Sequence, residues 1–196
     1  SGLTCGTDFF LVYSPERVDP GNQTYDTMNT NKVMGASDDD SRRLGLALYS
    51  AIMDTVVTVS SCSVAEMSKI FENTFRAVNI ALVNELTLLC DRMGVSIWEV
   101  LDAANTKPYG IMPFYPGPGV GGHCIPLDPH YLEWKAKQYD FVTRFISLAG
   151  DVNRSMPAFV RSKCVRLLSN KGLALSKAKV LLIGVAYKSN VDDWRE

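Results

Sequence analysis

The stretch of this sequence best suited to chemistry is GPGVGGHCIPLDP, residues 117–129, which surrounds Cys124 with glycines and prolines. Glycine lets a backbone approach a ligand closely, and proline restricts the conformations of a loop. A rigid loop that presents a thiol suits covalent catalysis, in which cysteine attacks an electrophilic carbon. The same composition also fits a plain surface turn that contains a buried, inert cysteine.

Asp128 follows Cys124 by four residues. Its carboxylate can cap the following helix, with Pro129 at the first helical position, and it can also orient a water molecule or Lys69. Both roles are compatible with each other.

The two histidines near this loop offer weaker alternatives. His123 and Cys124 are adjacent, and neighbouring side chains in an extended loop diverge, which disfavours a thiolate–imidazole pair. A zinc site built from Cys124, His123 and His130 would lack a fourth ligand. The remaining cysteines are widely scattered and form no C-x-x-C motif, so neither a disulfide framework nor a structural zinc site is indicated. These cysteines are Cys5, Cys62, Cys90 and Cys164.

A polar stripe with helical spacing precedes the loop and consists of Glu66, Lys69, Asn73 and Arg76. Lys69 and Asn73 fall one turn apart on the same side of a helix. Two such donors can stabilise an oxyanion. The alternative is a solvated face with an exposed Glu66–Lys69 pair, but asparagine is a poor residue for a helix interior unless its amide has a partner elsewhere.

Three further residues are candidates for ligand contact. Glu16, in SPERVDPG, comes at the end of a predicted strand, where α/β proteins commonly place such residues, although it also fits a surface turn. Lys188 and Arg195 follow the last predicted strand and could contact phosphate. No G-x-G-x-x-G follows a predicted strand and opens a helix, and G-x-x-x-x-G-K-[ST] does not occur, so the chain has no complete nucleotide-binding motif.

The elements that must position these residues begin with a small α/β unit. Residues 8–14, 32–36 and 55–60 are rich in β-branched and aromatic side chains and predict strands. Residues 38–53 predict a helix that starts in a Ser37–Asp40 capping region. This part is typical of the end of an α/β sheet whose earlier strands are missing.

A long helix is predicted over residues 63–93 and ends at Gly94. Its apolar stripe recurs at spacings of three and four: Met67, Phe71, Phe75, Val78, Leu82, Leu86 and Leu89. Such a helix is about 45 Å long, which favours packing against a second copy of the chain. A short helix over residues 96–106 follows.

Beyond the loop, helices are predicted over residues 128–138, 141–155 and 157–170. Residues 178–187, AKVLLIGVAY, predict a buried strand that opens another α/β unit. The fold class is therefore mixed α/β and mostly helical, and the chain is interpreted as an excerpt.

Composition excludes several partners. The formal net charge of −1 argues against nucleic acid and anionic membranes. No apolar run approaches the ~20 residues of a membrane span, and no signal peptide opens the chain. The scattered cysteines favour a reducing cytoplasm.

Five stretches occur in an order that resembles the UDP-sugar 6-dehydrogenases within the UDP-glucose/GDP-mannose dehydrogenase family: SPERVDPG, AEMSKIFENTFRAVNIALVNE, PGPGVGGHCIPLDP, GVAYK and DDWRE. The resemblance covers essentially the whole chain. It implies the C-terminal part of an NAD-binding Rossmann domain over residues 1–61, a central helical dimerisation domain over 62–172, and the start of a UDP-binding domain over 173–196. Many members have lysine at the position of Leu127; the absence of that lysine is a feature that this chain shares with the N-acetylhexosamine branch.

The resemblance also implies roles for single residues. Cys124 would be the nucleophile that captures the C6 aldehyde, Lys69 and Asn73 would stabilise negative charge on the C6 oxygen, and Asp128 would position water. Glu16 would serve thioester hydrolysis. Contacts with the nucleotide sugar are implied for Arg76, Tyr115, Gly121 and Lys188, and a contact with the NAD pyrophosphate for Arg195.

The implied partners are a UDP-sugar, two NAD per sugar and a second copy of the chain bound through the long helix. UDP-GlcNAc is the predicted substrate, with UDP-ManNAc or UDP-glucose as alternatives. Since the NAD-binding motif is missing, this chain alone is expected to be inactive. Two other interpretations remain open, namely an inert helical dimerisation module and a cysteine hydrolase or transferase that uses no nucleotide.

Overall fold

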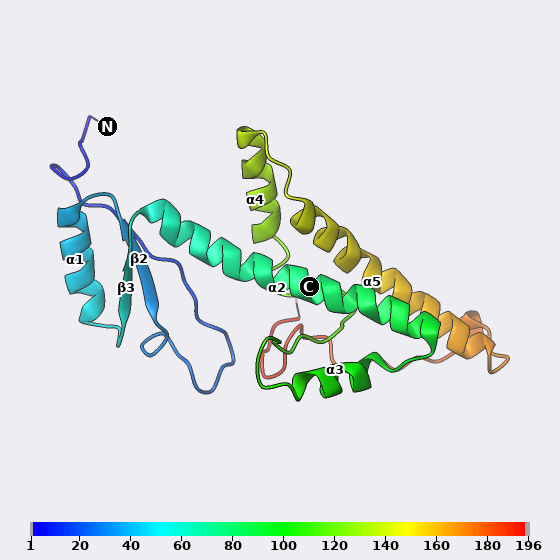
Figure 1. The fold of residues 1–196 in the computed structure, drawn as a ribbon. Coiled ribbons are helices and arrows are strands. Elements are labelled where there is room, and N and C mark those ends of the chain that lie inside the picture. The colour runs from blue at the N-terminus through cyan, green and yellow to red at the C-terminus, as the bar shows by residue number, and fades with distance from the viewer. Residues whose placement is uncertain (1, 195–196) are drawn as a thin grey trace. The chain divides into compact units, whose positions relative to one another are not determined.

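A computed structural model describes residues 2–194, which form two compact units. The first comprises residues 2–72 with Ser189–Val191, and the second comprises Asn73–Lys188 with residues 192–194. The long helix α2, Cys62–Met93, contributes to both (Figure 1). Helices predominate and strands are few, which confirms the predicted mixed, mostly helical α/β class. The predicted domain boundaries stay predictions.

A three-stranded sheet in the order β1-β2-β3 organises the first unit. Strand β2 (Lys32–Ala36) is buried along its whole length between β1 (Val12–Tyr13) and β3 (Val56–Val59). It pairs antiparallel with β1 and parallel with β3. Helix α1, Asp39–Ser50, connects β2 to β3 and begins at the N-cap Asp38, whose carboxylate accepts a hydrogen bond from the Ser41 N–H.

The strand predicted over residues 8–14 is wrong in extent, because only Val12 and Tyr13 pair with β2. The residues before them bond elsewhere. The Leu11 N–H donates to the Ser41 hydroxyl, and the Asp8 N–H donates to the Thr4 carbonyl within a turn. These local bonds use the backbone groups that a longer strand would need.

Helix α2 confirms the predicted element, and Gly94 ends it with a φ of 70°. The predicted apolar stripe, however, does not form the core within this chain, because most of its members are exposed: Met67, Phe71, Phe75, Leu82, Leu86 and Leu89. Smaller side chains, Ala77 and Ala81, are buried instead. Small residues allow close approach of another helix, and the Ala77 carbonyl accepts a hydrogen bond from Asn153 of helix α5 (Arg144–Ser169).

The second unit contains helices α3 (Ile97–Asn105), α4 (Asp128–Ala136) and α5 (Arg144–Ser169), and a 3₁₀ turn (Lys137–Tyr139) follows α4. Separate helices over 141–155 and 157–170 were the wrong prediction, since Pro157 lies inside α5. A proline removes one intrahelical hydrogen bond, and the bonds on either side continue the helix.

The buried strand predicted over residues 178–187 is also wrong. Residues 178–187 adopt no strand after the 3₁₀ turn Leu175–Lys177, and Leu181 and Ile183 are 83% and 88% exposed. A strand is stable only when a neighbour satisfies its backbone groups, and no such neighbour is paired with this segment among residues 2–194. Within the same residues, no helix combines the length and apolar character needed to cross a membrane.

Candidate active site

The turn that carries Cys124 leads directly into α4. The Cys124 carbonyl accepts hydrogen bonds from the Leu127 N–H at 3.1 Å and the Asp128 N–H at 2.8 Å. Cys124 is exposed, and its thiol forms no disulfide. The backbone of the predicted nucleophile is therefore fastened to the first turn of a helix while its side chain stays accessible.

Asn73 and Asp128, which are 55 residues apart in sequence, meet in the structure. Asn73 is buried, with 3% of its surface exposed, and its Nδ2 donates to Asp128 Oδ2 at 2.6 Å. The predicted capping role of Asp128 is wrong: Leu127 is the N-cap and makes no side-chain bond, while Asp128 is the first residue of α4. Its carboxylate faces the α2 amide instead.

The glycines before Cys124 permit close packing of Tyr187, the residue before Lys188. A Cβ atom added to Gly121 would lie 2.5 Å from the Tyr187 Cβ, and Gly122 has a φ of 93°, which disfavours any side chain. His123 Nε2 lies 2.7 Å from Asp193 Oδ2. The segment that contains Lys188 thus packs on the same loop that contains Cys124 and Gly121.

Two other predicted sugar contacts lie further along the same unit. Tyr115 stacks on Trp98 at a centroid distance of 6.1 Å, and its hydroxyl accepts a hydrogen bond from Asn105 at 3.4 Å. These contacts hold Tyr115 against α3. Arg76 is exposed on α2. Arg195 lies outside the described residues.

Glu16 belongs to the first unit, as does Lys69, which is partly buried one turn before Asn73 in α2. Glu16 Oε1 accepts from the Arg17 N–H at 2.7 Å and the Val18 N–H at 2.9 Å. The Val18 hydrogen bond is the main cause that lowers the pKa of the Glu16 carboxyl, with Arg17 and Lys32 adding to it against desolvation. The carboxylate form of Glu16 is therefore favoured.

Lys32 is a polar partner that sequence reasoning missed. Its side chain is 11% exposed, and its Nζ lies 3.5 Å from Glu16 Oε2 and donates to the Pro15 carbonyl at 3.3 Å. The ammonium group also lies 5.7 Å from the centre of the Tyr49 ring. The sequence signal that could have identified Lys32 is a lysine directly before the apolar residues of a predicted strand.

Asn84 and Asn153 were missed as well. Asn84 is fully buried in α2; its Nδ2 donates to Asn153 Oδ1 at 2.9 Å, and its Oδ1 accepts from the Gly117 N–H at 3.0 Å. One side chain therefore connects α2 with α5 and with the start of the glycine-rich loop. The signal was an asparagine inside an apolar helical run, the same anomaly that identified Asn73.

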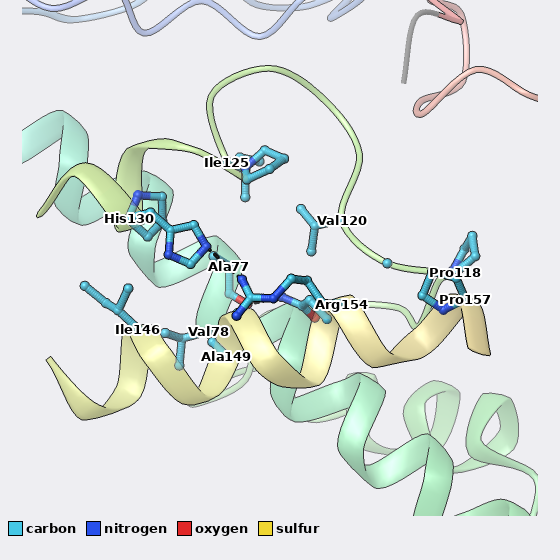
Figure 2. Close-up of a pocket in the computed structure, with 15 residues that line it drawn as sticks. Ala77, Val78, Pro118, Val120, Ile125, His130, Ile146, Ala149, Arg154 and Pro157 are labelled. Atoms are coloured by element: carbon cyan, nitrogen blue, oxygen red, sulfur yellow. Dashed lines mark hydrogen bonds between the residues drawn. The ribbon is translucent and has the colours of Figure 1, made fainter. Parts of the chain in front are cut away.

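A cavity of about 500 Å³ lies between α2, α4, α5 and the loop (Figure 2). Its lining is mostly apolar and includes Ile125 and Pro126, the two residues after Cys124. The cationic and imidazole groups in its wall are Arg154 and His130. Residues 2–194 contain no cluster of three His, Cys, Asp or Glu that could hold a metal ion.

Comparison with known proteins relates the chain to one enzyme family. Residues 63–155 match the UDP-glucose/GDP-mannose dehydrogenase family, central domain. A UDP-N-acetyl-D-glucosamine 6-dehydrogenase of Pseudomonas aeruginosa is 40% identical over 196 residues, which are all of this chain and 46% of that protein. Residues 63–155 therefore belong to the central domain of this family.

Other relatives agree with this placement. A UDP-N-acetyl-D-mannosamine dehydrogenase of Pyrococcus horikoshii is 37% identical over 195 residues, 100% of this chain and 46% of that protein. A solved structure of the UDP-D-ManNAc dehydrogenase from Pyrococcus horikoshii matches with a TM-score of 0.89 at 36% identity, covering 99% of this chain and 46% of that one. The chain thus spans a little under half the length of these relatives.

Proposed function

We propose that an enzyme containing this chain is an NAD-dependent UDP-sugar 6-dehydrogenase, which oxidises the C6 alcohol of a nucleotide sugar to a carboxylate. The observation that carries the proposal is the hydrogen bond between Asn73 and Asp128, at the helix turn that also binds the Cys124 carbonyl. It supports the proposal because a thiol, an amide donor and a carboxylate are gathered in one unit. The names of the relatives support the same reaction class.

Cys124 acts as the nucleophile in this proposal. Loss of hydride and a proton from the C6 alcohol gives an aldehyde, and the thiol adds to its carbonyl carbon to form a thiohemiacetal. Loss of a second hydride and proton gives a thioester. Water then cleaves the C–S bond, which releases the carboxylate and restores the thiol. Cysteine suits these steps because its thiolate adds readily to a carbonyl carbon.

The other residues that we assign to the reaction assist in separate ways. Lys69 and Asn73 donate hydrogen bonds to the C6 oxygen as negative charge develops on it. Asp128 positions water or accepts a proton, and its bond to Asn73 orients the amide. Glu16, whose lowered pKa favours the carboxylate form, accepts a proton from the water that hydrolyses the thioester.

NAD, the cofactor of this family, would supply the acceptor for the two hydrides when bound to the complete enzyme. A dinucleotide pyrophosphate is held by a G-x-G-x-x-G turn between a strand and a helix. The stretch with this spacing, residues 117–122, follows no strand, so the described residues do not make up an NAD site. We therefore assign no described residue to the nicotinamide. The 196-residue chain by itself is expected to produce no NADH from any UDP-sugar.

The proposed substrate is UDP-GlcNAc, with UDP-ManNAc as the nearer alternative and UDP-glucose as the more distant one. Support comes from the loop sequence and from the relative named for UDP-N-acetyl-D-glucosamine. The test is the steady-state rate of NADH formation by an enzyme containing this chain on each of the three sugars. Cys124→Ala should abolish uronate formation and leave nucleotide-sugar binding intact. A higher rate on UDP-glucose would contradict UDP-GlcNAc as the proposed substrate. Uronate formation by Cys124→Ala would contradict the proposed role of Cys124 as the nucleophile.

A second copy of the chain is the proposed partner of α2. Six large apolar side chains of its stripe are between 40% and 66% exposed, and a surface of this kind is an aggregation hazard unless it is covered. The length of α2, 32 residues, offers a continuous surface for a second α2.

The proposed location is the cytoplasm, because all five cysteines are free.

A further inference from the structure

His130, which the proposed mechanism does not use, lies at the centre of a hydrogen-bonded network between α4 and α5. Its Nδ1 lies 3.2 Å from Glu133 Oε2, and its Nε2 lies 3.2 Å from Arg154 Nη1. Ser147 of α5 donates to Glu133 Oε1 at 2.5 Å. We call these four residues the α4–α5 latch. Figure 2 shows the His130 ring directed from α4 toward Arg154 on α5.

The donors and acceptors of the latch agree with one form of the imidazole. Arginine can only donate, so His130 Nε2 must accept from Arg154 and the ring proton must lie on Nδ1, which donates to Glu133. Hydrogen bonds from the Ser147 hydroxyl, which is the larger cause, and from His130 lower the pKa of the Glu133 carboxyl and keep it an ionised acceptor. Arg154 is held in turn by Asp151 at 2.7 Å.

Gly150 of α5 makes room for the latch. A Cβ atom added there would lie 2.8 Å from His130 Cε1 and 2.9 Å from Arg154 Nη1, closer than a real Cβ contact allows. Glycine inside a helix is unfavourable by roughly 0.5–1 kcal/mol relative to alanine. The imidazole ring therefore occupies a space that α5 leaves open at a cost in its own helical stability.

The latch sits on the helix whose first turn carries the candidate chemistry. Asp128, two residues before His130, contacts Asn73, and the Asp128 N–H binds the Cys124 carbonyl. The N-cap of α4, Leu127, supplies no side-chain bond to the helix end. We propose that the α4–α5 latch is a positioning device that fixes Asp128 and the Cys124 turn relative to Asn73. This inference rests on the proposed function, and the latch residues are positioning residues.

The first test is Gly150→Ala in an enzyme containing this chain, with Ser162→Ala as a matched control on an exposed position of the same helix. Gly150→Ala displaces the His130 ring, so kcat should fall about tenfold or more, since errors near 1 Å in placement can cost ~10²-fold. KM for the UDP-sugar should change less than kcat. The thermal midpoint should hold or rise because alanine favours the helix. Ser162→Ala should leave kcat unchanged.

The second test is a double-mutant cycle with His130→Ala, which removes the ring that the methyl group introduced by Gly150→Ala would strike. Gly150→Ala should lower kcat in the wild-type background and have little further effect in the His130→Ala background. Full additivity overturns the latch, as does an unchanged kcat in Gly150→Ala. If wild-type enzyme oxidises no UDP-sugar, the proposed function fails and the latch fails with it. If wild type is active and both variants equal it, only the latch fails.

Discussion

Truncation of Asn84 to alanine tests how the glycine-rich loop is held on the helices. The substitution removes the bond to Asn153 on α5 and the bond from the Gly117 N–H. Asn84, Gly117 and Asn153 all lie in the second unit. Asn84 is 0% exposed and Asn153 is 9% exposed, so water does not readily replace the lost amide. The expected effect is a lower free energy of unfolding.

The magnitude follows from the two partners that lose their bond. Asn153 Oδ1 is left buried and unsatisfied, which costs about 2 kcal/mol, and the half-buried Gly117 N–H adds about 1 kcal/mol. Removal of the buried amide leaves a small cavity whose cost is roughly offset by the ~0.6 kcal/mol gain in helix propensity. Asn84→Ala should therefore lower the free energy of unfolding by about 3 kcal/mol.

Urea unfolding of the 196-residue chain, followed by tryptophan fluorescence, measures this change. All three tryptophans, Trp98, Trp134 and Trp194, belong to the second unit. Asn79→Ala is the matched control, because the Asn79 amide donates to the Phe75 carbonyl one turn earlier in the same helix, and its effect should stay within about 0.5 kcal/mol. A difference below ~1 kcal/mol between the variants would refute the reasoning.

Three further outcomes are expected. Asp38→Ala should lower the thermal midpoint at pH 7, and this deficit should shrink on acidification. Hydrogen bonds led by the Ser41 N–H hold the pKa of Asp38 at about 2 in the folded chain. The stability that Asp38 contributes is therefore present above its unfolded pKa near 3.8 and disappears toward pH 2. A deficit independent of pH contradicts this. Iodoacetamide should modify Cys124 about tenfold faster than Cys164, which is also exposed; mass spectrometry showing equal rates counts against the nucleophile. Leu82→Glu should convert a dimer to a monomer in sedimentation equilibrium, and a monomeric wild type removes the dimer proposal.

Local patterns were enough to predict the long helix α2 and its end. The three- and four-residue spacing of apolar side chains predicted the helix over 63–93, and Gly94 predicted its end, because helix period and a left-handed C-terminus depend on neighbouring residues alone. The same local logic marked Asn73 as an asparagine that needs a partner. The partner itself, Asp128, was not predictable from spacing.

Long-range packing decided the rest. The apolar stripe of α2 was predicted from its spacing and is mostly exposed, because the small side chains Ala77 and Ala81 are the buried ones and the Ala77 carbonyl meets α5. Residues 178–187 have a strand-like sequence and adopt no strand, since a strand depends on a neighbour elsewhere in the fold. The Asn84–Asn153 bond and the His130–Arg154 contact join residues 69 and 24 positions apart. Residue type and periodicity are properties of the sequence, whereas which polar groups meet is set by how the helices pack.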